Sequence, residues 1–234
     1  VNKDDVNAFI DTFKQQIETA EDALDKAELL LQSIFIDQLF ADNLRPFWPL
    51  DTHTLNYGLA YRQVAPALKN MLLIHIIRAC GFKVHAVYVP DEVMLRIVCD
   101  DDYAIIFNSV DGMPIDWMEL DQRINSDSNN EEQSSLEEIE DKQLIIQHLV
   151  SLKTALIREK KFTEALQAVE LILALNPDDP YHRRDRGFLL QQLDCYKVAF
   201  DDYKFYVKNC PQEAEAKILQ MQLDMIEGVN TVLH

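Results

Sequence analysis

A repeat with a period of 34 residues most restricts the fold of this chain of 234 residues. Between about residues 145 and 212, apolar, small and proline positions recur in the same order. The matched pairs are Phe162 with Tyr196, Ala165 with Ala199, Leu166 with Phe200, Leu173 with Val207, Asn176 with Cys210 and Pro177 with Pro211. Small residues let paired helices approach closely, and a proline ends the second helix of each unit. Six matches in phase favour a true repeat over two unrelated helical hairpins.

This pattern resembles the tetratricopeptide repeat, in which each unit is a helix–turn–helix. We expect repeats at about 145–178 and 179–212, then a capping helix at about 213–228, so that residues 136–234 form one helical region. Two repeats rarely bury enough apolar surface to stand alone. We therefore expect the segment at about 136–148 to dock on the domain that precedes it.

The preceding residues, 1–125, predict an α+β domain. Helical spacing of apolar residues predicts two helices within residues 2–40 and another at about 67–79, which ends before Gly81. Runs rich in β-branched and aromatic residues then alternate with turns, which predicts an antiparallel sheet. These runs are residues 84–89, 93–98 and 103–107. Residues 126–135 are acidic and polar, which indicates a linker or a surface loop.

The charge of the chain restricts its partners. Lys and Arg number 22 against 40 Asp and Glu, so the net charge is −18. An acidic surface opposes binding to nucleic acid or to anionic lipid, because both need a basic face. We therefore expect no nucleic acid and no membrane among the partners, and we expect a protein or peptide instead.

The cysteines indicate a reduced, cytoplasmic protein. They are Cys80, Cys99, Cys195 and Cys210. No two have the spacing of a zinc site, and none lies near a histidine at ligand spacing. We expect reduced thiols that are mostly buried, no metal and no cofactor. The acidic start of the chain is unlike a signal peptide.

Several motifs of the middle and the end resemble the SirB1 family of bacterial proteins, also called UPF0162. In the middle they are Arg62-Gln63, Arg78-Ala-Cys-Gly81, Pro90-Asp-Glu-Val-Met-Leu-Arg96 and Ile106-Phe-Asn-Ser-Val-Asp-Gly112. Towards the end they are Leu175-Asn-Pro-Asp-Asp-Pro-Tyr181, Arg184-Asp-Arg-Gly187, Gln192-Leu-Asp-Cys195 and Val232-Leu-His234. The resemblance implies a transglutaminase-like, papain-like domain followed by tetratricopeptide repeats.

The same resemblance locates a degenerate catalytic triad. Active transglutaminase-like enzymes use a Cys at the start of a core helix, a His and an Asp. The matching positions here are Ala65 (or Pro66), Glu92 and Asn108. Neither Ala nor Pro can attack a carbonyl, and Glu92 cannot polarise a thiol as a His does. The resemblance thus implies a non-catalytic interaction scaffold.

Two alternatives stay open. An amide hydrolase or transferase could use a non-standard site near Glu92 and Asn108, with Arg62 nearby. A structural role through self-association is the other, since the sequence does not indicate the oligomeric state.

One basic cluster in this acidic chain is a candidate partner-binding site. Arg183, Arg184 and Arg186 lie near the start of the second repeat, and Tyr203 could reach a groove beside them. Arginine clusters bind acidic peptides well. The competing interpretation, which we favour, is a set of salt bridges to Asp178 and Asp179.

Overall fold

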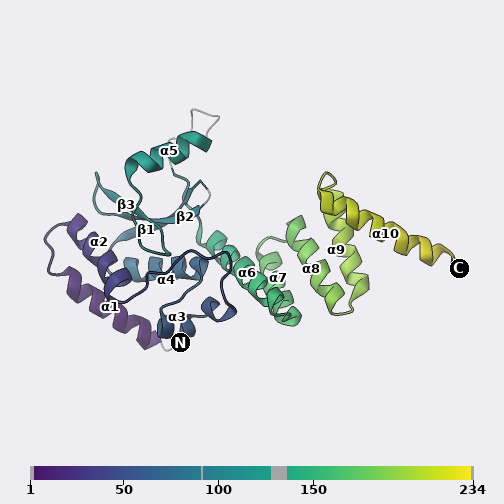
Figure 1. The fold of residues 1–234 in the computed structure, drawn as a ribbon, viewed down its shortest axis with the longest axis horizontal. Coiled ribbons are helices and arrows are strands. Elements are labelled where there is room, and N and C mark those ends of the chain that lie inside the picture. The colour runs from purple at the N-terminus through teal and green to yellow at the C-terminus, as the bar shows by residue number, and fades with distance from the viewer. Residues whose placement is uncertain (1–2, 91, 128–135, 233–234) are drawn as a thin grey trace. The chain divides into compact units, whose positions relative to one another are not determined.

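In the computed structural model, which describes residues 3–90, 92–127 and 136–232, the contacts divide the chain into two compact units (Figure 1). The first comprises residues 1–148 and the second residues 149–234. Helix α6 (Asp141–Arg158) runs through the division between them. The expected linker at 126–135 lies mostly outside the described residues, although its first two positions belong to helix α5 (Trp117–Asp127).

The first unit is a small sheet between helices. Its strands β1 (Lys83–Val89), β2 (Glu92–Val98) and β3 (Ala104–Phe107) form an antiparallel sheet in the order β1-β2-β3. The register pairs Lys83 with Val98 and Leu95 with Phe107. The expectation of an α+β domain with an antiparallel sheet is therefore confirmed.

The two faces of the sheet are covered by different helices, as Figure 1 shows for α4 and α5. Helices α1 (Lys3–Ile17), α2 (Ala23–Gln32) and α4 (Pro66–Ala79) contribute to the main core on one face. Helix α5 covers the other face, where Leu120 packs with Val87 and Ile106. Period-two alternation in the strands explains both contacts, because successive side chains point to opposite faces.

Local signals explain where the helices start and stop. Pro66 occupies the first turn of α4, and Gly81 just beyond it has φ +96°, a left-handed conformation that favours glycine. The Asp22 side chain accepts a hydrogen bond from the Asp25 N–H at 2.8 Å and caps α2. A π-helical turn, η1 (Ser33–Asp37), continues α2. A 3₁₀ turn, η2 (Leu50–His53), and helix α3 (Leu55–Tyr61) complete this unit.

The two edges of the sheet differ in how much of each is paired with other backbone. Residues 137–139 run beside β1, where Tyr88 N–H donates to the Glu137 carbonyl at 2.9 Å and Ile139 N–H donates to the Ala86 carbonyl at 2.8 Å. Leu144, further along, is buried in the main core. The segment before His148 thus packs on the first unit. On the other side, residues 114–115 pair only with the C-terminal end of β3.

The second unit consists of antiparallel helices that follow the 34-residue period. After α6 come α7 (Phe162–Leu175), α8 (Pro180–Gln192), α9 (Tyr196–Asn209) and α10 (Ala214–Val232). Ala165 and Ala199, matched by the repeat, are both fully buried. Gly187 of α8 packs so closely on α9 that a Cβ there would lie 2.7 Å from the Tyr203 ring.

Candidate functional site

Glu92 and Asn108 lie together at one end of the strands. Glu92 begins β2, and Asn108 directly follows β3. The Asn108 side-chain amide donates to the Glu92 carboxylate at 2.6 Å, and its own oxygen accepts the Val110 N–H at 2.7 Å. Both ends of the Asn108 amide are therefore occupied, which fixes its orientation.

A third residue, Arg123 of α5, completes this cluster. Its guanidinium donates to the second oxygen of Glu92 and, on the same helix, to Glu119. These hydrogen bonds, first the one to Glu92 and then the one to Glu119, raise the pKa of Arg123 above its ordinary value. The Glu92 carboxylate thus accepts from two side chains at once, as a structural anchor would.

The position that would hold a nucleophile is closed. Ala65 immediately precedes α4 and is 0% exposed. Its N–H donates to the Thr52 carbonyl at 2.9 Å, and its carbonyl accepts the Lys69 N–H at 2.9 Å. A buried methyl group at this place offers no atom for covalent chemistry.

Arg62 lies in another environment. Its Nε donates to the Gln38 carbonyl at 3.0 Å, and its guanidinium stands 4.7 Å from the centre of the Phe9 ring and 5.2 Å from that of Phe40. Burial lowers the pKa of Arg62. The cation beside Glu92 is therefore Arg123, which the sequence interpretation did not select.

Lys69 is a buried charge that the sequence interpretation also missed. It lies one turn beyond Ala65 and is 1% exposed. Its ammonium donates to the Val110 carbonyl at 2.8 Å and to the Phe40 carbonyl, so it ties two loops to α4. Burial lowers the pKa of Lys69 to about 8, against the opposing pull of Asp42 and Asp111.

The arginine cluster of α8 is occupied by partners within the second unit. Arg186 makes two hydrogen bonds to Asp202, each 2.7 Å long, and Arg183 donates to the same carboxylate at 3.0 Å. Asp202 is 1% exposed on α9. Arg184 pairs with Asp185 at 2.8 Å and with Glu215 at 2.6 Å.

These partners differ from the expected pair of aspartates. Asp179 instead caps α8, where its side chain accepts the N–H groups of Tyr181 and His182. Tyr203 is buried, donates to Gln191 at 2.8 Å and packs against Gly187. Burial raises the pKa of Tyr203 to about 12. Its ring is thus a packing element between α8 and α9 rather than part of an open surface.

A second buried ion pair holds α6 to α8. The Lys153 ammonium contacts the Asp185 carboxylate, and both groups are largely buried. Although burial alone would raise the pKa of Asp185, the nearby Lys153 and Arg184 hold it below its ordinary value. Asp185 therefore remains a charged link between the helices.

The cysteines are free thiols in varied environments. Cys80, Cys99 and Cys210 are half-buried and Cys195 is exposed, so the expectation that the thiols are mostly buried is wrong. Burial raises the pKa of the Cys80 thiol, and burial together with Asp100 raises that of Cys99. A raised pKa disfavours the thiolate, so neither is activated as a nucleophile.

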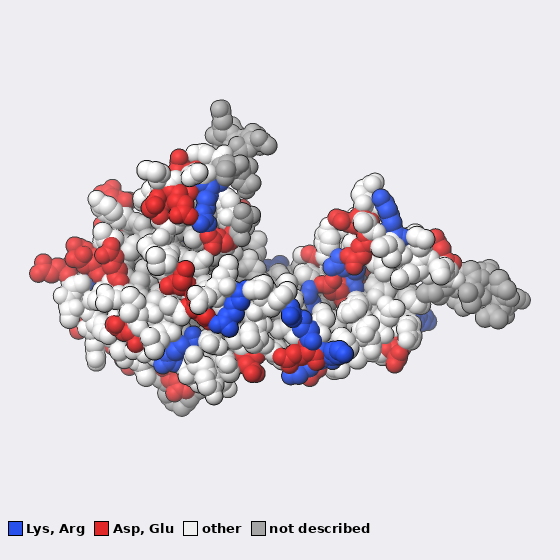
Figure 2. Space-filling view, in the orientation of Figure 1, with Lys and Arg blue, Asp and Glu red and all other residues white. Residues whose placement is uncertain are grey.

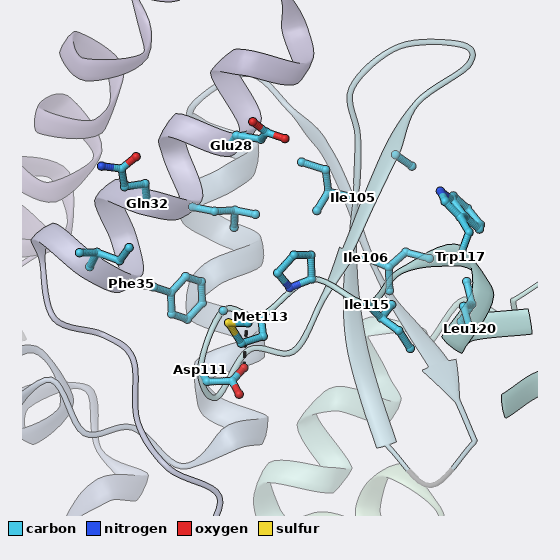
Figure 3. A pocket seen from close by; sticks show the side chains of 15 residues that line it. Glu28, Gln32, Phe35, Ile105, Ile106, Asp111, Met113, Ile115, Trp117 and Leu120 are labelled. Atoms are coloured by element: carbon cyan, nitrogen blue, oxygen red, sulfur yellow. Dashed lines mark hydrogen bonds between the residues drawn. The ribbon is translucent and has the colours of Figure 1, made fainter. Parts of the chain in front are cut away.

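A groove of about 500 Å³ borders β3 on the first unit. Figure 3 shows it between the helix that bears Glu28, Gln32 and Phe35 and the strand that bears Ile105 and Ile106. Most of its lining is apolar, and Glu92 and Asn108 do not line it. Within the described residues, every helix is too short or too polar to cross a membrane.

Comparisons with known proteins agree with the two units. The sequence model of the transglutaminase-like superfamily matches residues 2–150, and that of the tetratricopeptide repeat matches residues 152–224. No solved structure is significantly similar to the chain.

Three bacterial relatives are similar over most of the chain. A UPF0162 protein of Vibrio cholerae is 26% identical over 202 residues, covering 85% of this chain and 75% of that protein. The UPF0162 protein YchA of Escherichia coli K12 is 26% identical over 234 residues, covering 99% and 87%. Protein SirB1 of Salmonella typhimurium is 25% identical over 237 residues, covering 99% and 87%. The chain therefore belongs to the transglutaminase-like superfamily and, within it, to the SirB1 (UPF0162) family, and in this chain a tetratricopeptide repeat region follows the transglutaminase-like domain.

Proposed function

We propose that this protein is a non-catalytic interaction scaffold. Its transglutaminase-like domain is a pseudoenzyme with Ala65, Glu92 and Asn108 at the triad positions, and its repeat region binds a protein or peptide partner. The observation that best supports this proposal is the occupied state of Glu92. Its carboxylate is held by Asn108 and Arg123, and no nucleophilic atom replaces the missing thiol at Ala65.

The repeat region supports the binding half of the proposal. Stacked helical repeats present extended surfaces that proteins of this architecture use to bind partners. Helix α8, the first helix of the second repeat, is joined to α10 by Arg184 and Glu215 at 2.6 Å and to the residue before α10 by Tyr181 and Glu213 at 3.1 Å. We place the partner surface on these two helices.

This placement gives the arginines an indirect role. Arg183 and Arg186 hold Asp202, and Arg184 holds α10 beside α8. The cluster then shapes the partner surface, and the side chains that contact the partner are exposed neighbours such as Ile218 and Met221 of α10.

The test is crosslinking of the native chain in its own cell extract, followed by identification of the captured proteins. We expect Ile218→Glu with Met221→Glu to lose the specific partner. Leu171→Glu with Val198→Glu, which changes two other exposed apolar positions, on α7 and α9, is the control. A wild-type chain that captures nothing beyond background would refute the proposal, as would equal loss in both pairs.

The runner-up function is an amide hydrolase or transferase centred on Glu92 and Asn108. The short contact between these polar groups is the observation in its favour. A screen for amine release from peptide amides would detect it. If the wild-type chain released amine and Glu92→Gln did not, the scaffold proposal would be wrong for the first unit.

A further inference from the structure

The groove beside β3 has an open strand edge as its floor. Cys99 N–H donates to the Tyr103 carbonyl at 2.9 Å, so Cys99 and Tyr103 occupy a hydrogen-bonded position of the ladder, just before β3. Hydrogen-bonded and non-hydrogen-bonded pairs alternate along an antiparallel ladder. By the observed register, the backbone groups of Ala104 and Ile106 therefore point away from β2, towards the groove.

Only part of this edge is used inside the chain. The Ile106 carbonyl accepts the Ile115 N–H at 2.9 Å. Among the described residues, none makes a backbone hydrogen bond to the N–H or carbonyl of Ala104 or to the N–H of Ile106. The opposite edge of the sheet is covered by residues 137–139. An open edge of this kind is a template for an added strand.

The walls of the groove are apolar on both sides of that edge. Leu31 and Phe35 of the α2 side form one wall, and Ile115, Trp117 and Leu120 form the other. Three lining side chains remain largely exposed, at 64% for Ile36, 64% for Met113 and 67% for Trp117. A strand inserted here would be buried on both faces, and such strands are continuous apolar runs.

The charge of the groove restricts its occupant further. The charged residues of the lining are both acidic, Glu28 and Asp111, and Figure 3 shows them at opposite ends of the groove. Figure 2 shows acidic side chains over α2, and both acidic and basic side chains over α5. A complementary ligand has basic residues at its ends.

We propose that this groove binds an extended segment of a partner protein, consisting of a short apolar run flanked by Lys or Arg, as a further strand beside β3. The N–H and carbonyl of Ala104 and the N–H of Ile106 hold the added strand, the two apolar walls bury its side chains, and Glu28 and Asp111 attract its ends. This surface belongs to residues 1–148, so the proposal stands or falls separately from that for the repeat region.

The test uses a peptide of four apolar residues, matching the four residues of β3, with lysines at each end. The chain has 2 tryptophans, so Trp48→Phe leaves Trp117 in the groove as the only one. We expect the peptide to change Trp117 fluorescence in a saturable way, and a version with glutamates at its ends to bind much more weakly. Absence of a saturable change up to about 1 mM peptide would overturn the proposal.

Two variants test whether peptide binding depends on strand pairing and on charge rather than on non-specific apolar contact. Ala104→Pro removes an N–H that points into the groove and leaves the ladder to β2 intact. We expect the affinity of this variant for the peptide to fall about tenfold, because one hydrogen bond is lost. Glu28→Lys should also weaken binding, whereas Asp25→Lys on the same helix but outside the groove should not.

The ligand provides a check that does not depend on folding of a variant. Two peptides are made in which alternate amides are N-methylated, on odd or on even residues. An added strand directs only every second N–H towards its neighbour, so only one of the two peptides should lose binding to the wild-type chain. Equal binding by both would overturn the proposed pairing. The last experiment is sedimentation of the chain without peptide. A dimer that Ala104→Pro abolishes would overturn the proposal, because it would show that a second copy of the chain occupies the groove.

Discussion

Replacement of Lys69 by methionine should change how the stability of the first unit depends on pH. Lys69 is buried, and burial lowers the pKa of its ammonium from 10.5 to about 8. Each pKa unit corresponds to about 1.4 kcal/mol. Burial of the charged form therefore costs about 3 kcal/mol at neutral pH, an amount that methionine, of similar length and without charge, does not incur.

The sign of the effect follows from which state holds the proton. Below about pH 8, Lys69 is charged in both the folded and the unfolded chain, so its cost is constant. Between about pH 8 and 10.5, only the unfolded chain keeps the proton, and the cost disappears. The free energy of unfolding of the wild-type chain should thus rise, relative to Lys69→Met, by about 2 to 3 kcal/mol between pH 7 and pH 10.

The assay is urea unfolding followed by tryptophan fluorescence at several pH values. Both tryptophans, Trp48 and Trp117, belong to the first unit, so the signal reports on that unit alone. Lys142→Met, which removes an exposed lysine of α6, is the matched control and should run parallel to the wild-type chain. If the difference between Lys69→Met and the wild type stayed constant within about 0.5 kcal/mol, the reasoning on the buried charge would be refuted.

Three further predictions test the packing of the two units. Asp202→Asn removes the charge that two arginines of α8 share, and it should lower the stability of the second unit by about 2 to 4 kcal/mol in thermal unfolding followed by circular dichroism. Gly187→Ala should cost about 1 to 3 kcal/mol in the same assay, because its Cβ would meet the Tyr203 ring at 2.7 Å; an unchanged midpoint would contradict this close packing. Burial lowers the pKa of both His53 and His148, whose rings lie 6.1 Å apart, so the first unit should lose stability as the pH falls below about 6.5, and His53→Gln should reduce that loss in urea unfolding.

Helix limits were the most predictable part of the fold, because single residues set them. Pro66 and Gly81 bound α4, and the expected helix at 67–79 differs from it by one residue. Helix α5 was not predicted, because its composition is polar and its apolar residues are few. Trp117 and Met118 are exposed, and among residues 117–125, whose burial the structure describes, only Leu120 is buried. A helix with so few apolar residues resembles a polar loop in sequence, even though those residues recur with helical spacing.

The partners of charged residues were the least predictable part. Sequence proximity suggested Asp178 and Asp179 for the arginines of α8, whereas the structure pairs them with Asp202 and Glu215. In a helical hairpin, the residues that face one another across the turn are far apart in sequence. Asp202 faces the arginines because α8 and α9 fold back on each other. The two helices lie close together where Gly187 packs against Tyr203.

The same limitation explains what was and was not foreseen at the candidate site. Alignment with the family motif identified Glu92 and Asn108 as equivalent positions, and the structure joins them by a 2.6 Å hydrogen bond. Their cation, Arg123, comes from α5, so it could not be identified without that helix. This origin bears on function, because Arg123 and Asn108 together occupy the carboxylate that a catalytic role would need free. A side chain that links β2 to α5 stabilises the sheet face opposite the main core, and this structural role of Glu92 supports the proposal that the domain is non-catalytic.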